Sequence, residues 1–305
     1  MMSILNRIIS FVRKLYNTIY YNIGSKDDFI ILRSWVIQWG KKICHCNYGD
    51  DLNFFLISKL SGKKVLTTAN FLHKKNINNF MCIGSLVEYA SSSIVWGSGA
   101  LYGDVNKFQP KPLKVCAVRG PLTRKYLLSL GVECPEIYGD PALLLPYVYN
   151  PSQLNGNKKW RVGIIPHIAD KNNSLIKEYV KLNSDNSVII RLDKYKSWTD
   201  VIDKINNCSI LLSSSLHGLI ISDAYGIPNV WIKLSEKVEG NGFKFQDYFK
   251  SVKRNEGTPI EINETSDFTM AITKALDYKQ IEFDCKPLLN SCPFKILTEL
   301  YDDRN

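Results

Sequence analysis

The stretch Cys208-Ser-Ile-Leu-Leu-Ser-Ser-Ser-Leu-His217-Gly218 decides the fold expected for this chain. An apolar run ends there in three serines, and a helical pattern follows. Gly226 and Pro228 close that pattern before a second apolar run, Val230 to Ile232. This order of strand, turn, helix and strand is typical of half of a doubly wound α/β sheet. Ser213 to His217 therefore stand at a strand's carboxyl end, where such sheets bind ligands.

The same turn has the features of an anion-binding site. The N–H groups of a first helical turn have no partner within the helix, and the helix dipole adds partial positive charge. A histidine at that position can contact a bound phosphate or transfer a proton. The alternative interpretation is a serine N-cap with His217 packed beside it. The spacing alone leaves both open.

Length and composition narrow the class of protein. A chain of 305 residues suggests roughly two domains. Hydrophobic content of 45% with 22% charged residues is ordinary for a globular protein with sizeable cores. The net charge of +10 favours acidic partners such as phosphate esters or anionic lipid. Because the lysines are scattered and no basic helical stripe carries interleaved aromatics, we expect no nucleic-acid partner.

The eight cysteines show no disulfide framework, and no cleavable signal peptide is visible. Both observations favour a cytoplasmic protein. Cys44-His45-Cys46 is the only metal-like cluster, but it has no second ligand pair. We expect its two cysteines to pack together in the core on one face of a strand. Carboxylates do not cluster at ligand spacing, so we expect no metal site. We also expect no cofactor.

Residues 1–24 form a basic amphipathic pattern. Seven large apolar residues recur at helical spacing, and no acid occurs before Asp27. The stripe consists of Leu5, Ile8, Ile9, Val12, Leu15, Tyr16 and Ile19, with Arg7, Arg13 and Lys14 supplying charge. There is no apolar run of about 20 residues to span a bilayer. The helix either lies peripherally on an anionic membrane surface or docks on its own domain or a partner subunit.

The chain is expected to have three parts. The first part is an N-terminal helix at 1–28. The other two are Rossmann-like α/β domains at 29–150 and 151–305, which face each other across a cleft. The second domain also contains the C-terminal helices. Pro146 to Lys159 is rich in Pro, Asn, Gly and Ser and is the expected linker. In each half, short apolar runs alternate with helical patterns, as parallel sheets require.

Several chemically capable residues follow predicted strands. Arg119 stands between an apolar run and a helix that begins at Pro121, and its alternative role is a salt bridge. Asp140 and His167 stand at two further strand ends. Gly97 and Gly99 follow the run Ser93–Trp96. Their spacing is weak evidence for dinucleotide binding, but it suits a loop that approaches a phosphate or an acceptor.

Taken together, these motifs resemble the polysaccharide pyruvyl transferase family. The resemblance covers roughly residues 29–250 and rests on the order and spacing of six motifs. They are Asn47-Tyr-Gly-Asp50-Asp51-Leu52, Trp96-Gly-Ser-Gly99, Val118-Arg119-Gly-Pro-Leu-Thr-Arg124, Tyr138-Gly-Asp140-Pro141-Ala142, Gly163-Ile-Ile-Pro166-His167 and Ser213-Ser-Ser-Leu-His217-Gly218.

The resemblance implies a fold similar to the two-domain GT-B glycosyltransferases, with an N-terminal acceptor domain and a C-terminal donor domain. It also implies transfer of a pyruvyl group from phosphoenolpyruvate to two hydroxyls of a sugar, which forms a ketal and releases phosphate. The acceptor would then be a bacterial capsule, exopolysaccharide or O-antigen repeat. We expect it to be built on a lipid carrier at the inner face of the cytoplasmic membrane.

The resemblance also suggests roles for individual residues. Some members carry arginine two residues before the motif histidine, where this chain has Ser215, so Arg119, Arg124 or Lys233 must supply that cation. Arg119 would clamp one donor anion. The remaining predicted binding residues are Ser213, Ser214, Ser215, Leu216, Gly218, Gly97 and Gly99.

For proton transfer we expect His217 as general acid, with His167 as the second candidate. Asp50 or Asp140 would act as base, although Asp140 could equally stabilise the turn before Pro141. Two rival hypotheses stay open. One is a GT-B glycosyltransferase that uses a nucleotide-sugar, although only Asp223, Glu236 and Glu239 follow the glycine-containing turn. The other is a non-catalytic scaffold for glycan assembly.

Overall fold

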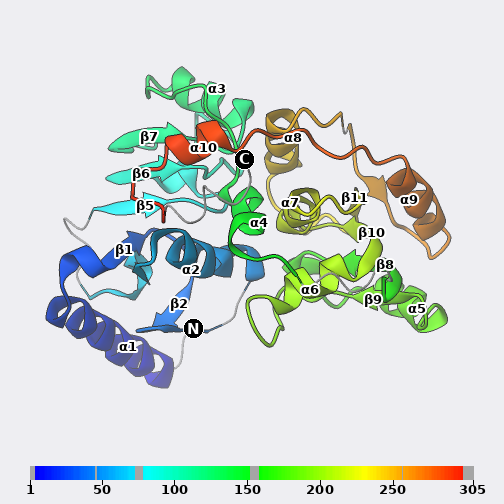
Figure 1. Cartoon of the computed structure of the whole chain (residues 1–305), viewed down its shortest axis with the longest axis horizontal. Coiled ribbons are helices and arrows are strands. Elements are labelled where there is room, and N and C mark those ends of the chain that lie inside the picture. Colours follow the sequence, from blue (N-terminus) through cyan, green and yellow to red (C-terminus); the bar gives the residue numbers. More distant parts are fainter. Residues whose placement is uncertain (1–3, 45–46, 73–77, 152–157, 256, 298–305) are drawn as a thin grey trace.

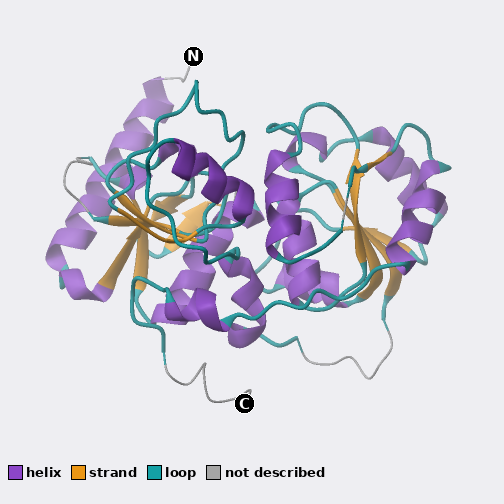
Figure 2. Ribbon diagram, turned by 90° about the horizontal axis from the view of Figure 1, so that it is seen from above, coloured by secondary structure: helices purple, strands orange, loops and turns teal. Residues whose placement is uncertain are grey.

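The computed structural model describes residues 4–44, 47–72, 78–151, 158–255 and 257–297. They form two α/β units, each built on a five-stranded sheet with helices packed on its faces (Figures 1 and 2). The prediction of two Rossmann-like domains is confirmed. The finer likeness to GT-B enzymes stays a prediction.

The first sheet has the strand order β4-β1-β5-β6-β7, and all its pairings are parallel. Its strands are β1 (Phe29–Leu32), β4 (Lys64–Thr67), β5 (Asn79–Met81), β6 (Ser93–Trp96) and β7 (Lys114–Ala117). The helices of this unit are α1 (Ile4–Ile23), α2 (Tyr48–Ser61), α3 (Pro121–Ser129) and α4 (Leu145–Val148). Every residue of β1 is buried, because helices cover both faces of a parallel sheet.

The second sheet has the order β12-β11-β10-β8-β9 and is also parallel. Its strands are β8 (Trp160–Ile165), β9 (Ser187–Ile189), β10 (Cys208–Ser213), β11 (Asn229–Lys233) and β12 (Ile260–Glu261). Its helices are α5 (Ser174–Leu182), α6 (Asp200–Asn206), α7 (Leu216–Ala224), α8 (Phe243–Ser251) and α9 (Asp267–Leu276). The stretch from Cys208 thus forms β10, α7 and β11 as predicted.

Short single-turn segments complete the described structure. They are η1 (Lys26–Asp28), η2 (Thr68–Asn70), η3 (Val87–Tyr89), η4 (Pro141–Leu144) and η5 (Ile168–Asp170). An antiparallel hairpin, β2 (Ile37–Trp39) with β3 (Lys42–Cys44), lies beside α1. Cys44 is exposed in this hairpin, so the prediction that it packs in the core is wrong. His45 and Cys46 lie outside the described residues.

The two units share one continuous core. Leu52 and Leu56 of α2 belong to the same buried cluster as Leu216 and Leu219 of α7. The Tyr48 N–H donates to the Leu192 carbonyl at 2.8 Å, which ties the start of α2 to the second unit. The contact between the units is therefore an apolar, hydrogen-bonded interface, and residues from both can hold fixed positions at a shared site.

The C-terminal segment returns to the first sheet after α9. Helix α10 (Lys286–Asn290) lies close to β6, and the Trp96 indole N–H donates to the Leu288 carbonyl at 2.9 Å. The Phe294 ring packs edge-on against Phe80 and Trp96 at 5.5 Å. These last described residues, which we assigned to the second domain, thus lie against the first. The division at residue 150 stays a prediction.

Candidate active site

A cavity of about 430 Å³ lies where the two units meet. Residues that follow β5, β8 and β10 line it, so it lies outside the carboxyl ends of strands from both sheets, as parallel sheets favour. The described lining residues are Trp35, Asn47, Asp50, Gly84, Ser85, Leu86, Leu101, His167, Ile168, Ala169, Ser215, Leu216, His217, Lys237, Glu239 and Lys244. The structure thereby brings together five predicted residues: Asp50, His167, Ser215, Leu216 and His217.

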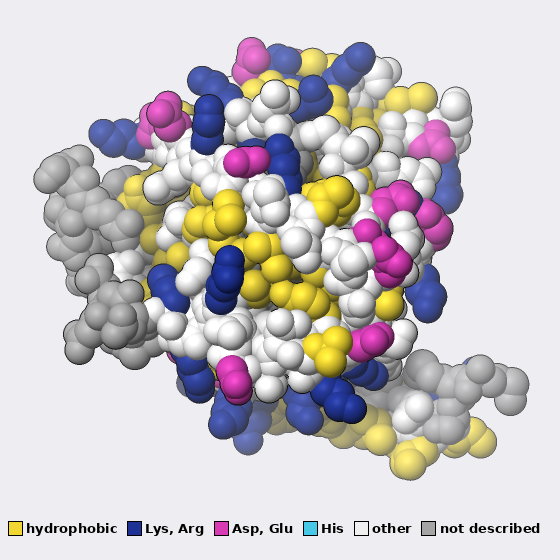
Figure 3. Space-filling view, turned by 90° about the vertical axis from the view of Figure 1, so that its right-hand side faces the viewer, with side chains coloured by type: hydrophobic (Ala, Val, Ile, Leu, Met, Phe, Trp, Pro, Cys, Tyr) yellow, Lys and Arg dark blue, Asp and Glu magenta, His cyan; other side chains and the backbone are white. Residues whose placement is uncertain are grey.

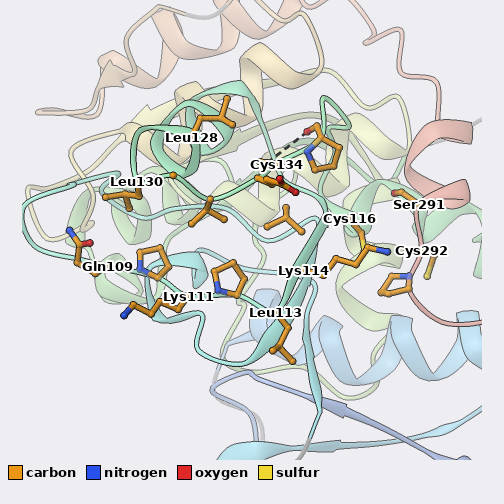
Figure 4. A pocket seen from close by; sticks show the side chains of 18 of the residues that line it. Gln109, Lys111, Leu113, Lys114, Cys116, Leu128, Leu130, Cys134, Ser291 and Cys292 are labelled. Atoms are coloured by element: carbon orange, nitrogen blue, oxygen red, sulfur yellow. Dashed lines mark hydrogen bonds between the residues drawn. The ribbon is translucent and has the colours of Figure 1, made fainter.

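A larger hollow of about 1090 Å³ lies elsewhere, between the start of β7, the end of α3 and the segment after α10 (Figure 4). Leucines, prolines and cysteines line most of it, together with Lys111 and Lys114. Its described lining residues include no histidine and no aspartate. The smaller cavity between the units is therefore the better candidate for acid–base chemistry.

His217 lies in the first turn of α7 and packs against the first turn of α2. A Cβ on Gly49 would come within 2.1 Å of its Nδ1, so only glycine lets the two turns approach this closely. Burial, together with the charges of Arg119, Lys244 and His167, lowers the pKa of His217 to about 3. The ligand-free imidazole is therefore neutral at pH 7 and has little capacity to donate a proton.

Asp140 lies behind His217. Its Oδ2 is 3.9 Å from the His217 Nε2, and neither atom has a hydrogen-bond partner among the described residues. Its Oδ1 accepts the Ala142 N–H at 2.9 Å, so Asp140 also stabilises the turn before Pro141. Burial raises the pKa of Asp140 to about 7, against the opposing effects of that N–H and of Arg119. Asp140 thus lies beside His217 but outside the lining of the cavity.

Asp50 lies in the first turn of α2 and lines the same cavity. Asn47 caps this helix by accepting the Gly49 N–H at 3.3 Å, and its amide donates to the Asp50 Oδ2 at 3.1 Å. Burial raises the pKa of Asp50 to about 6, while the Asn47 hydrogen bond lowers it. A carboxylate with a pKa close to neutrality that lines a cavity is a suitable general base.

His167 follows β8 and lines the same cavity. Its Nδ1 accepts the Ala169 N–H at 3.2 Å, so the neutral ring carries its proton on Nε2. Its backbone N–H donates to the Ser214 Oγ at 2.9 Å, which joins the ends of β8 and β10. Burial, with the Lys244 charge, lowers the pKa of His167 to about 4.

Lys244 is a cavity residue that the sequence motifs did not reveal. It lies in the first turn of α8, directly after Gly240 and Gly242, which both have a positive φ. Burial and the Arg119 charge lower its pKa to about 8, while Asp50 and Glu239 oppose this shift. The Gly-Asn-Gly turn before a helical pattern was the available signal. Lys233, which we had considered, instead pairs with Glu236 and Glu261 outside this cavity.

Arg119 occupies a different position from the one expected of a clamp. Its side chain is fully buried, and its Nε donates to Asp247 of α8 at 3.0 Å. Its other nitrogens donate to the Ser85 Oγ at 2.7 Å and to the Ala100 carbonyl at 2.6 Å. The geometry favours the alternative of an ion pair, which here is buried and joins the two units. Ser85 lines the cavity, so Arg119 reaches it only through that hydroxyl.

Four further predicted residues lie outside the cavity lining. Arg124 donates to the Cys134 carbonyl at 3.1 Å. A Cβ on Gly97 would come within 2.3 Å of Pro141, and one on Gly99 within 2.2 Å of the Arg119 guanidinium. A Cβ on Gly218 would lie 2.3 Å from the Ser213 Oγ. These glycines permit close packing, and Gly84 lines the cavity in place of Gly97 and Gly99.

The serine turn is held by its own hydroxyls. The Ser213 Oγ accepts the Ser215 N–H at 3.1 Å and donates to a backbone carbonyl, either Ser215 at 2.8 Å or Ile165 at 3.2 Å. Ser213 and Ser214 therefore shape the turn from beneath, while Ser215 and Leu216 line the cavity. The first-turn N–H groups of α7 remain outside its internal hydrogen bonding and can serve an anion. Within the described ranges, no three histidine, cysteine or carboxylate side chains gather as a metal site would require.

Comparison with known proteins adds independent information. The model of the family described as polysaccharide pyruvyl transferase matches residues 45–236. The chain is 29% identical over 207 residues to "Uncharacterized protein L143" of Acanthamoeba polyphaga mimivirus, which covers 66% of this chain and 69% of that protein. It is also 29% identical over 216 residues to "Succinoglycan biosynthesis protein ExoV" of Rhizobium meliloti, which covers 68% of this chain and 62% of that protein. Lys237, Glu239 and Lys244 lie outside the range that the family model matches.

The buried ion pair gives a stability prediction. Asp247→Ala leaves the Arg119 charge buried without its partner, so we expect the free energy of unfolding to fall by about 3–5 kcal/mol. The control is Asp28→Ala, which removes an exposed pair with Lys64 at 3.7 Å and should change it by less than about 1 kcal/mol. Urea denaturation followed by tryptophan fluorescence measures both. Equally small losses would contradict a structural role for Arg119.

Proposed function

Because this chain belongs to the polysaccharide pyruvyl transferase family, we propose that it transfers a pyruvyl group from phosphoenolpyruvate to two hydroxyls of a sugar. The reaction forms a pyruvate ketal in a surface polysaccharide and releases phosphate. The name of the relative ExoV, a succinoglycan biosynthesis protein, supports an acceptor of this class. No cofactor is needed, because the donor carries its own activated carbon.

The observation that carries this proposal is that Lys237, Lys244 and the first turn of α7 all line the cavity. Lys244 and His167 both contribute to the lowered pKa of His217, and Arg119 lowers the pKa of both His217 and Lys244. Such mutual repulsion is relieved when an anion binds among these groups. Phosphoenolpyruvate supplies a phosphate and a carboxylate. Lys244, Lys237 and the first turn of α7 can receive them.

Donor binding makes His217 able to act as the general acid. The negative charge of the ligand raises the pKa of His217 from its ligand-free value of about 3, so the imidazole can take up a proton. Asp140, whose Oδ2 is 3.9 Å from the His217 Nε2, can then pair with the charged ring. His217 then gives that proton to the methylene carbon, and the adjacent carbon becomes oxocarbenium-like.

The two sugar hydroxyls complete the ketal in turn. Asp50 takes the proton of the first hydroxyl as its oxygen bonds to the oxocarbenium-like carbon. The second hydroxyl oxygen then bonds to the same carbon while the carbon–phosphate oxygen bond breaks. Of the two hydroxyl protons, one balances the proton delivered to the methylene carbon and the other leaves on the phosphate. Atoms and charge are conserved without any further reactant.

One observation is also compatible with the alternative of a glycosyltransferase. Glu239 lines the cavity, and the Tyr102 hydroxyl donates to its Oε2 at 2.9 Å. A carboxylate at that position could accept a hydrogen bond from the ribose or sugar hydroxyl of a nucleotide-sugar. Asp223, the other nearby candidate, is buried and is paired with Arg254 at 2.9 Å.

We expect phosphoenolpyruvate at about 100 times its dissociation constant to stabilise the protein by about 2.7 kcal/mol in a thermal-shift titration. Lys244→Met should remove most of this stabilisation, because it removes a buried cation from the donor site. The matched control Lys233→Met changes an exposed lysine that pairs with glutamates outside the cavity, so its response should stay at the wild-type level.

Stabilisation by nucleotide-sugars in place of phosphoenolpyruvate would overturn the proposal and favour the glycosyltransferase. No response to either donor would favour a non-catalytic scaffold. Equal losses in Lys244→Met and Lys233→Met would place the donor elsewhere.

Helix α1 also supports a location at an anionic membrane surface. One side of the helix docks on the protein: Asn17 bonds to the Gln38 carbonyl and the Gly40 N–H at 2.9 and 2.6 Å. The apolar stripe faces outward, with Leu5 64% and Ile8 54% exposed. Figure 3 shows hydrophobic side chains along the lower edge of the molecule, where Figure 1 places α1, beneath several Lys and Arg side chains.

The two interpretations of this helix are therefore compatible, since it docks on its own unit and still presents an apolar face. No helix in the described part of the chain is long and apolar enough to cross a membrane. A surface contact through α1 would place the enzyme beside a lipid-linked acceptor at the inner face of the cytoplasmic membrane.

We expect the protein to sediment with vesicles that contain phosphatidylserine and much less with pure phosphatidylcholine vesicles, and added salt should weaken the binding. Ile8→Glu should abolish this binding, because it places a charge in the apolar stripe at a residue that is 54% exposed. The control Leu182→Glu alters a leucine on α5 that is 72% exposed and should bind like the wild type. Vesicle binding that survives Ile8→Glu would contradict the role of α1.

A further inference from the structure

A second cavity, of about 640 Å³, adjoins the proposed reaction cavity on the first unit. Trp35 and Leu86 line both, so the two cavities meet at these side chains. The remaining described lining residues are Arg33, Ser34, Thr68, Ala69, Asn78, Asn79, Met81, Tyr89, Ser91, Ser92 and Leu113. The volume falls within the range of roughly 300–1,000 Å³ that is typical of small-molecule sites.

An exposed aromatic pair stands at the junction. Trp35, three residues after the end of β1, is 61% exposed, and Tyr89 is 40% exposed. Their rings meet edge to face, with centroids 6.0 Å apart and planes at 80°. Each ring thus packs against the other while part of its surface stays exposed. Aromatic surface in contact with water at a cavity is a frequent feature of ligand sites.

A buried hydroxyl beside this pair has no partner. Ser34 is only 4% exposed and lines the second cavity, and its Oγ has no hydrogen-bond partner among the described residues. A hydroxyl can both donate and accept. Leaving such a group unsatisfied is unfavourable, so a ligand with a hydroxyl in this cavity would supply the missing bond.

The charge of the second cavity differs from that of the first. Arg33 is the one charged side chain among its described lining residues. The reaction cavity, in contrast, is lined by two lysines and two histidines: Lys237, Lys244, His167 and His217. The second cavity therefore suits a largely neutral ligand that presents a flat apolar face and hydroxyl groups. A pyranose ring has both features, since its C–H groups form an apolar face and its hydroxyls project from the edge.

We propose that this cavity binds the sugar adjacent to the one that receives the pyruvyl group. The inference rests on the proposed function, because it takes the first cavity as the place of ketal formation. The adjacent sugar stacks on Trp35 and Tyr89, and one of its hydroxyls bonds to Ser34. The acceptor is then recognised as a disaccharide or longer glycan rather than as a single sugar.

The test uses an array of bacterial surface mono-, di- and longer oligosaccharides, probed with the labelled full-length protein. We expect the wild type to bind particular di- or oligosaccharides and not their component monosaccharides. Trp35→Ala should lower the affinity for these glycans about tenfold or more, as expected for an aromatic residue at the centre of a binding site. Ser34→Ala should lower it to a smaller extent.

The matched control is Phe11→Ala, which truncates an aromatic residue on α1 that is 56% exposed and should bind glycans like the wild type. Equal binding by Trp35→Ala and Phe11→Ala, equal binding of monosaccharides, or no glycan binding by the wild type would overturn the inference. Circular dichroism of each variant checks that the fold is intact.

A parallel thermal-shift titration with phosphoenolpyruvate separates this inference from the proposed function. Ser34→Ala should keep the donor's stabilising effect, because Ser34 lines the second cavity and not the reaction cavity. Donor binding without Trp35-dependent glycan binding would overturn the sugar subsite alone. Trp35-dependent glycan binding without any response to the donor would overturn the pyruvyl transfer and leave a glycan-binding site.

Discussion

The buried ion pair between Arg119 and Asp247 is the interaction on which the geometry of the site depends. Both side chains are fully buried, and Asp247 also accepts bonds from the Thr123 hydroxyl and N–H at 2.6 and 2.8 Å. A pair removed from water in this way is stable only when its remaining donors and acceptors are satisfied. It holds α8 of the second unit against α3 of the first. Lys244 lies three residues before Asp247 on α8, on a neighbouring part of the helix surface, so the same contact sets its position.

The pair also shapes the electrostatics of the cavity. The Arg119 charge contributes to lowering the pKa of both His217 and Lys244, although Arg119 does not line the cavity. Burial lowers the pKa of His217 and Lys244 but raises that of Asp50 to about 6, because the charged form of a carboxyl group is the deprotonated one. The ligand-free site therefore disfavours the charged forms of His217, His167, Lys244 and Asp50. Bound phosphoenolpyruvate would reverse this for the cations, which connects donor binding to the appearance of a competent acid.

The sequence could predict the residues whose position follows from local structure. His217, His167 and Asp50 each stand at a strand's carboxyl end or in the first turn of a helix, and the structure brings them to one cavity. Arg119 has the same local setting, yet it points into the interface, because its partner lies 128 residues away on α8. No local pattern separates these two outcomes. Lys244 was missed for the same reason, since only the packing of α8 against the first unit carries it to the cavity.

The central claim, that phosphoenolpyruvate binds beside Lys244 and His217 in this cavity, is tested most directly by calorimetry. Phosphoenolpyruvate would be titrated at pH 8, near the Lys244 pKa of about 8, in two buffers of different ionisation enthalpy. Lys244 is then partly deprotonated. Bound phosphoenolpyruvate raises the pKa of Lys244 and of His217, so we predict a net uptake of protons on binding. Binding with no proton exchange, or with proton release, would contradict the account.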